Sequence, residues 1–179
     1  MVKRNKVRCA IALGSNLGDS LAIVNQAVCT LQREVAITAV SRWYKTKPIG
    51  YQNGKPVIVD QPDFINGCVV GTTCLSAAEL LEFLLQVEQS FGRVRTADKG
   101  ARTLDLDLLF YGDAIINTPT LQVPHPRMTD RGFVLFPLAE IAPDWWHPVA
   151  KRSVLHLAQS LSHPLCAPIP YGNLPTQCQ

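Results

Sequence analysis

Residues 102–110 read Arg102-Thr103-Leu104-Asp105-Leu106-Asp107-Leu108-Leu109-Phe110. Successive side chains of a β-strand point to opposite faces, so this alternation predicts a strand whose acidic and apolar side chains are separated. One face is expected to carry the apolar side chains, which are Leu104, Leu106, Leu108 and Phe110. Asp105 and Asp107 then stand side by side on the other face, about 6.5–7 Å apart along the strand.

The segments around this stretch predict further strands and helices. Four strands are expected where apolar and β-branched residues alternate or cluster, at residues 7–13, 35–46, 64–73 and 102–111. One helix is expected to run from Asp19 to about Arg33, and a second from the Ser76/Glu79 capping box to Gly92. This order of elements predicts an α+β fold, a ferredoxin-like split-βαβ antiparallel sheet with both helices packed on one face.

Loops are expected between and beyond these elements. Glycines and prolines predict a long surface loop at residues 50–63, and Gly112-Asp113 predicts a hairpin turn into residues 114–117. Ten of the 13 prolines lie beyond Ile116, which predicts a loop-rich C-terminal third with short helices laid over the sheet.

The chain is expected to form a single domain over residues 1–179, because this length supports one sizeable hydrophobic core. We expect the core to span about residues 7–161, with a helix near residues 153–161. The tail at residues 162–179 is expected to be irregular. No internal repeat or separable linker interrupts the chain.

Composition and charge exclude several classes of protein. No apolar stretch approaches the roughly 18 residues that a membrane-spanning helix needs. The net charge of +3 depends on Lys3, Arg4, Lys6 and Arg8, so no nucleic-acid partner is expected. The six cysteines include no CxxC pair and no ladder of short spacings, which predicts neither a zinc site nor a disulfide scaffold and favours a reducing cytoplasm.

The acidic pair is the strongest candidate for chemistry. Adjacent carboxylates repel each other unless a cation lies between them, and Mg²⁺ is a cation that prefers carboxylate and phosphate oxygens. For Asp105 and Asp107 alone, the solvated face of a strand is an equally good interpretation. Arg93, Arg95 and Arg102 favour a site for a magnesium polyphosphate, because arginines neutralise phosphoryl oxygens.

Other motifs are weaker. The segment Gly14-Ser15-Asn16-Leu17-Gly18-Asp19 lacks the lysine of a P-loop and the three glycines of a dinucleotide fingerprint, which favours a tight structural turn. No GxSxG elbow or Ser-His-Asp spacing supports acyl transfer. Two alternatives to a diphosphotransferase stay open: a magnesium-dependent nuclease or nucleotide hydrolase, and a non-catalytic ferredoxin-like binding module.

The chain resembles the 6-hydroxymethyl-7,8-dihydropterin pyrophosphokinases over about residues 7–150. The matching stretches follow the order of the family and are Ala12-Leu13-Gly14-Ser15-Asn16-Leu17-Gly18, Tyr44-Lys45-Thr46-Lys47-Pro48-Ile49-Gly50, Gln61-Pro62-Asp63-Phe64-Ile65-Asn66, Gly92-Arg93-Val94-Arg95, Arg102-Thr103-Leu104-Asp105-Leu106-Asp107, Val123-Pro124-His125 and Arg131-Gly132-Phe133. The resemblance implies a cytoplasmic monomer that transfers the β,γ-diphosphate of ATP to the hydroxymethyl group of 6-hydroxymethyl-7,8-dihydropterin and releases AMP, in folate biosynthesis.

The resemblance also implies roles for particular residues. Asp105 and Asp107 would hold two Mg²⁺ ions, and these acids with Arg93 and Arg102 would be the catalytic residues. The ATP-binding residues would be Glu88, Arg93, Arg95, Arg102, Leu108, His125 and Arg131. The pterin-binding residues would be Thr46, Pro48, Ile49, Gly50, Phe64, Asn66 and Phe133. Relative to the family, an insertion at residues 51–60 is expected to reshape the pterin entrance, and the loop at residues 96–101 is shorter.

Overall fold

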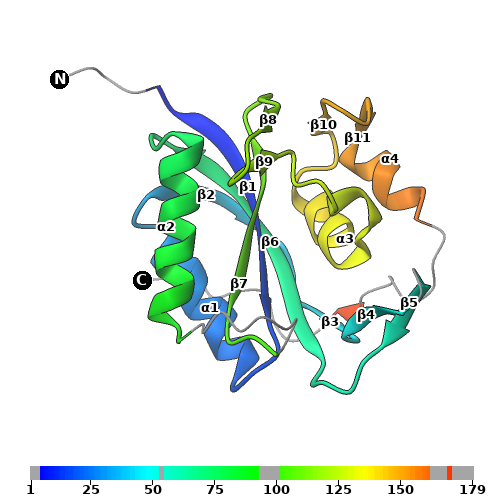
Figure 1. Cartoon of the computed structure of the whole chain (residues 1–179). Helices are drawn as coiled ribbons and strands as arrows, with labels where there is room; N and C mark the ends of the chain where they lie inside the picture. The colour runs from blue at the N-terminus through cyan, green and yellow to red at the C-terminus, as the bar shows by residue number, and fades with distance from the viewer. Residues whose placement is uncertain (1–4, 53–54, 93–100, 162–168, 171–179) are drawn as a thin grey trace.

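The computed structural model describes residues 5–52, 55–92, 101–161 and 169–170 (Figure 1). The strands are β1 (Val7–Ser15), β2 (Val35–Val40), β3 (Tyr44–Thr46), β4 (Ile49–Gln52), β5 (Lys55–Ile58), β6 (Phe64–Thr73), β7 (Asp105–Tyr111), β8 (Ile116–Asn117), β9 (Gln122–Val123), β10 (Trp146–His147), β11 (Arg152–Ser153) and β12 (Ile169–Pro170). The helices are α1 (Ser20–Leu31), α2 (Ala77–Ser90), η1 (Met128–Asp130), α3 (Gly132–Ile141) and α4 (Val154–Gln159).

A six-stranded antiparallel sheet is built around β6. The strand order is β12-β3-β6-β1-β7, and β2 also pairs with β6. β6 pairs with β1 from Thr73 opposite Val7 to Ile65 opposite Ser15, while its other side pairs with β2 and then β3. β7 pairs with the far side of β1 and so forms one edge of the sheet. The predicted antiparallel sheet with packed helices is therefore confirmed.

Helices cover both faces of this sheet (Figure 1). Between the sheet and α1 and α2 lies a buried cluster, the α1–α2 core, which includes Ile11, Val28, Val69, Leu84 and Leu106. On the other face α3 and α4 enclose the α3–α4 core, which includes Ala12, Cys68, Val70, Leu135 and Leu138. The position of α3 was not predicted, because a helix buried between the sheet and another helix is apolar all round and has no amphipathic period.

Local capping signals determine where α1 and α2 begin. The Asp19 side chain accepts a hydrogen bond from the Ala22 N–H at 3.1 Å, as predicted for α1. Both bonds of the capping box form at α2, with Ser76 N–H donating to Glu79 at 2.7 Å and Glu79 N–H donating to the Ser76 hydroxyl at 3.3 Å. Gly92 has a φ of +78°, a conformation that favours glycine, and it follows the end of α2.

The single strand predicted at residues 35–46 is wrong, because β2 and β3 are separate. Between them Ser41 takes both backbone groups of Cys68: its N–H donates to the Cys68 carbonyl, and its hydroxyl accepts the Cys68 N–H, both at 2.9 Å. The Trp43 ring is fully buried over Gly67, where an added Cβ would lie 2.5 Å from two ring carbons. This tertiary contact pulls the chain out of a regular strand.

Two predicted loop regions also differ. Residues 50–63 contain the β4–β5 hairpin instead of an uninterrupted loop, and the insertion at residues 51–60 contributes to it. β8 pairs with β9, so the hairpin predicted between residues 102–111 and 114–117 is wrong. Here the Gly112 N–H donates to the Arg8 carbonyl at 2.7 Å, which directs the chain back to β1.

The described cysteines can be compared with the expectation that the chain has no disulfide scaffold. Cys9, Cys68 and Cys74 have free thiols, as the spacing predicted, whereas Cys29 is disulfide-bonded, which was not predicted.

Within the described residues, no helix is long and apolar enough to cross a membrane. The predicted helix near residues 153–161 is confirmed by α4, which begins after the capping residue Ser153. The tail at residues 162–179 lies outside the described residues except for β12.

We predict that Gly67→Ala lowers the free energy of unfolding by about 1–3 kcal/mol, because the added methyl group collides with the buried Trp43 ring. Urea denaturation measures this change. In a double-mutant cycle with Trp43→Phe, the two costs should be less than additive, since the smaller ring leaves room for the methyl group. Strictly additive costs would contradict the contact.

Candidate active site

β7 presents Asp105 and Asp107 on the same face. They lie opposite Gly14 and Ala12 of β1, while Leu106 between them is buried in the α1–α2 core. Both carboxylate side chains are partly exposed, at 23% and 31%. The predicted alternation is therefore correct for both acids.

The alternation fails at the far end of the strand. The pairing of β7 with β1 shifts register between Ala10 and Ile11, so Leu109 is an extra residue on β7. As a result Phe110 belongs to the α3–α4 core, and its predicted place beside Leu106 and Leu108 is wrong. A β-bulge of this kind reverses the direction of the side chains that follow it.

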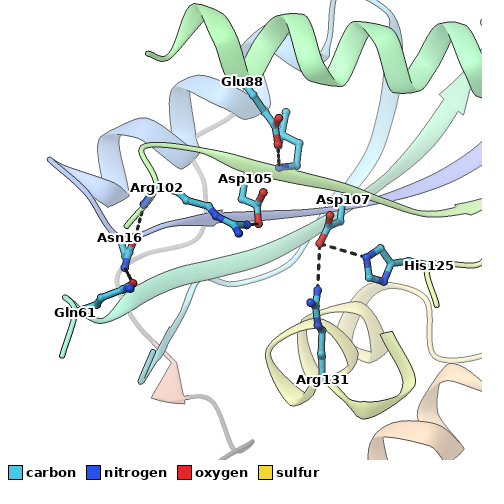
Figure 2. Close-up of polar contacts among 9 residues, drawn as sticks. Asn16, Gln61, Glu88, Arg102, Asp105, Asp107, His125 and Arg131 are labelled. Carbon is cyan, nitrogen blue, oxygen red and sulfur yellow. Dashed lines mark hydrogen bonds and ion pairs between the residues drawn. The ribbon is translucent and has the colours of Figure 1, made fainter. Parts of the chain in front are cut away.

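Arginines neutralise both carboxylates. Arg102 Nη1 donates to Asp105 Oδ2 at 2.5 Å, and Arg131 Nη1 donates to Asp107 Oδ2 at 3.3 Å (Figure 2). Arg102 precedes β7 in the chain, whereas Arg131 precedes α3 and so reaches the site from the opposite layer. The structure thus brings together two of the four expected arginines; Arg93 and Arg95 lie outside the described residues.

His125 is the third group beside these acids. Its Nε2 lies 3.7 Å from Asp107 Oδ2, and its Nδ1 accepts the Arg127 N–H at 3.2 Å. Burial lowers the pKa of His125; the Asp107 carboxylate opposes this shift, and Arg131 and Arg127 reinforce it. The imidazole is therefore neutral at pH 7, and Nε2 carries the proton because Nδ1 is an acceptor. It can donate one hydrogen bond toward an anion.

Asn16 connects three segments of this site. Its Oδ1 accepts the Arg102 N–H at 2.7 Å, and its own backbone N–H donates to the Arg102 carbonyl at 3.0 Å. Its Nδ2 donates to Gln61 Oε1 at 3.3 Å (Figure 2). The same Nδ2 also donates to the Pro62 carbonyl at 3.2 Å. The side chain is only 2% exposed. Sequence reasoning treated residues 14–19 as a structural turn and missed this bridge, whose partners are distant in the chain.

Two further residues that were expected to bind ATP have buried side chains. Glu88 of α2 is 1% exposed, and its Oε1 accepts the Leu106 N–H at 2.7 Å. Leu108 is 4% exposed and its side chain lies in the α1–α2 core, so only its backbone could contact a ligand.

Some of the expected pterin-side residues meet where β6 lies between β1 and β3. Asn66 is opposite Gly14 on one side and Tyr44 on the other. Its Nδ2 donates to Thr46 Oγ1 at 2.7 Å, and a Cβ placed on Gly14 would lie 2.8 Å from its Oδ1 and 3.9 Å from the Phe64 ring. Asn66, Thr46 and Phe64 therefore form one cluster around Gly14, the Asn66 cluster.

The other residues expected to bind the pterin lie around this cluster or beyond it. Pro48 is buried between β3 and β4, and Ile49 is the half-buried first residue of β4. Gly50 pairs with Val57 in the β4–β5 hairpin. Phe133 lies in the first turn of α3, and its ring centroid is 5.5 Å from Arg131 Cζ. Arg131 thus contacts both this ring and Asp107, which links the aromatic side chain to the acidic pair.

Comparisons with known proteins agree with the resemblance. The model of the 7,8-dihydro-6-hydroxymethylpterin-pyrophosphokinase (HPPK) family matches residues 10–143. The 2-amino-4-hydroxy-6-hydroxymethyldihydropteridine pyrophosphokinase of Synechocystis sp. is 40% identical over 164 residues, which are 90% of this chain and 80% of that relative. The Bacillus subtilis protein of the same name is 47% identical over 133 residues, 73% of this chain and 75% of its own length.

The fold is similar to that of a longer protein. A crystal structure of wild-type HPPK-DHPS from Plasmodium falciparum with SDX-DHP has a TM-score of 0.70 and 15% sequence identity. The similarity covers 89% of this chain and 45% of that chain, so this chain spans less than half of it. On the match of the family model and the identity to these relatives, the chain belongs to the 7,8-dihydro-6-hydroxymethylpterin-pyrophosphokinase family.

Proposed function

We propose that this chain, an ATP-dependent diphosphotransferase of folate biosynthesis like its relatives, transfers the β,γ-diphosphate of ATP to 6-hydroxymethyl-7,8-dihydropterin at the Asp105–Asp107 face of β7 and releases AMP. The observation that carries this assignment is the acidic pair flanked by Arg102 and Arg131 in a chain of this family. The nuclease and binding-module alternatives are not favoured, because the relatives are named as pyrophosphokinases.

The acidic pair fits Mg²⁺. In the described residues, no group of three or more His, Cys, Asp or Glu side chains could hold a metal ion. Two carboxylates suffice, because Mg²⁺ in nucleotide sites usually takes one or two and fills its other positions with water and phosphate oxygens. We infer two ions with bound ATP, held by Asp105 and Asp107. When bound, such ions polarise phosphoryl oxygens and stabilise attacking and leaving oxygens of an in-line displacement.

The cationic residues around the acids would bind the phosphates. The ATP phosphates carry negative charge and can replace the carboxylates as partners of Arg102 and Arg131. The protonated Nε2 of His125 can donate to a phosphate oxygen. Arg93 and Arg95 are proposed for the same task from the family resemblance, with Arg93 and Arg102 neutralising charge as the diphosphate transfers. The Leu108 backbone is proposed on the nucleotide side, where the family resemblance also implies Glu88.

The Asn66 cluster would recognise the pterin. A carboxamide can both donate and accept hydrogen bonds, which suits the amide edge of a pterin, and Thr46 holds the Asn66 side chain in place. Phe64 and Phe133 offer faces on which a flat heterocycle can stack. Pro48, Ile49 and Gly50 are proposed to line the same side, next to the β4–β5 hairpin.

Several broader properties are also proposed. The strand order, with β1 and β6 central and β7 and β3 outside them, supports a ferredoxin-like split-βαβ fold, and the two cores on one sheet support a single domain over residues 1–179. We propose a monomer without nucleic-acid or membrane partners. We propose a cytoplasmic location, which the free thiols of Cys9, Cys68 and Cys74 support.

Replacing either acid should abolish transfer. We expect Asp105→Asn and Asp107→Asn each to lower kcat for AMP formation by about a hundredfold or more, because a ligand of the metal is lost. The fold should persist, because partly exposed ion pairs contribute only about 1 kcal/mol or less. Asp113→Asn is the matched control, since this exposed acid pairs with Arg8 away from the site. Full activity in either site variant would overturn the metal assignment.

Asn16→Ala should weaken the binding of both substrates, because it removes the bridge between Arg102 and the segment at Gln61 and Pro62. Gln61 lies three residues before Phe64, which is proposed to stack on the pterin. Gln61→Ala removes only one bond of the bridge and should therefore weaken pterin binding alone. Calorimetric titration with a non-hydrolysable ATP analogue, and then with the pterin, measures both affinities. If Asn16→Ala affects one substrate only, the bridge does not connect the two halves of the site.

Gly14→Ala should raise KM for the pterin by about tenfold, since the added methyl group displaces the Asn66 carboxamide and removes one well-oriented hydrogen bond to the ligand. The affinity for the ATP analogue should stay unchanged. Steady-state kinetics with each substrate varied in turn makes the comparison. If only the KM for ATP changed, the proposal that Asn66 binds the pterin would be wrong.

A further inference from the structure

Glu88 is a buried carboxylate at the edge of the sheet. Among the described strands β7 pairs with β1 alone, so within the described residues its outer edge is not covered by another strand. The outward N–H of Leu106 donates to Glu88 Oε1 at 2.7 Å, and the Glu88 side chain is 1% exposed (Figure 2). The bonded amide lies between Asp105 and Asp107 in the chain, which connects Glu88 to the acidic pair.

The burial of this polar side chain indicates a specific role. Neighbouring positions on the same helix face, Leu84 and Val87, are buried and apolar, so an apolar residue at position 88 would satisfy the core. A buried carboxyl group is unfavourable unless it is hydrogen-bonded, and the Leu106 N–H supplies such a partner. Glu88 therefore holds the edge of β7 more firmly than packing alone would.

The bonded peptide controls the direction of a carboxylate. The Leu106 nitrogen belongs to the Asp105–Leu106 peptide group, so fixing it restricts ψ of Asp105 and φ of Leu106. These angles set the directions in which the Asp105 and Asp107 side chains leave the strand. Because side chains that orient metal ligands commonly determine affinity for the metal, the bond has a direct consequence for the proposed site.

We propose that Glu88 is a positioning residue that orients Asp105 and Asp107 for the metal–ATP complex through the Leu106 amide, and does not act by touching ATP. This inference rests on the proposed function of the acidic pair. It assigns the residue a different task from the nucleotide contact that the family resemblance implies. The two tasks predict different results when metal and nucleotide are titrated separately.

The experiment compares Glu88→Leu, Glu88→Gln and the control Glu82→Gln, which makes the same chemical change at an exposed position of α2. Mn²⁺ is titrated into each protein with a saturating non-hydrolysable ATP analogue, and the analogue is titrated separately without metal. Hydrogen exchange of the Leu106 amide is followed by NMR, and thermal unfolding is recorded for each variant.

Glu88→Leu should weaken Mn²⁺ binding by about tenfold or more, the usual effect of losing a side chain that orients a metal ligand. Exchange of the Leu106 amide should accelerate, while the affinity for the analogue without metal stays unchanged. Glu88→Gln keeps an oxygen acceptor and should weaken Mn²⁺ binding by only a few-fold. Glu82→Gln should match the wild type in all four measurements.

Unchanged Mn²⁺ affinity in Glu88→Leu would overturn the proposal, as would equal losses in Glu88→Leu and Glu88→Gln. A loss of metal-free analogue binding would assign Glu88 to direct ATP contact instead. If Glu88→Leu does not fold, Glu88→Gln decides: faster Leu106 exchange with weaker Mn²⁺ binding supports the proposal, and unchanged Mn²⁺ binding overturns it. The proposed function is tested separately, by AMP formation from ATP and the pterin in the wild type. Because the Mn²⁺ titration needs no turnover, each test can fail without the other.

Discussion

The antiparallel pairing of β7 with β1 is the constraint on which the candidate site depends. It places Asp105 opposite Gly14 and Asp107 opposite Ala12, and buries Leu106 between them in the α1–α2 core. A shift of one residue would reverse these faces, putting both carboxylates in an apolar core at a large cost in free energy. The register that stabilises the fold is therefore the same register that presents the acids, and it is protected by the hydrophobic residues on either side of each acid.

Charge compensation by two arginines allows the two acids to stand side by side. Arg102 and Arg131 hold the carboxylates in the described structure, and a neutral His125 completes the surroundings of Asp107. Because these ion pairs are partly exposed, they stabilise the fold only weakly and can exchange partners at a small cost. Arg102 and Arg131, which neutralise the acids, thus lie close to the place where the phosphates of ATP would need positive charge.

The sequence predicted what neighbouring residues determine and missed what distant contacts determine. The Ser76 capping box, the strand at residues 64–73 and the alternation of Asp105 and Asp107 follow from local patterns, and all three are present. The break between β2 and β3 depends on Trp43 packing over Gly67, which no local pattern contains. The bulge at Leu109 depends on register against β1, so the face of Phe110 was predicted incorrectly. For the site, residue types were predictable, but the bridging role of Asn16 was not.

That bridge also determines when the site can form. The partners of Asn16 lie 86 residues away at Arg102 and 45 residues away at Gln61. Arg131 reaches Asp107 across 24 residues and from the opposite layer of the molecule. Contacts between residues so far apart in the chain require most of the loop-closure entropy to be lost first. The sheet, both helical layers and the turn after β1 must therefore be in place before the acids, the arginines and the Asn66 cluster acquire their mutual geometry, so a variant that loosens any layer will disturb the site along with the fold.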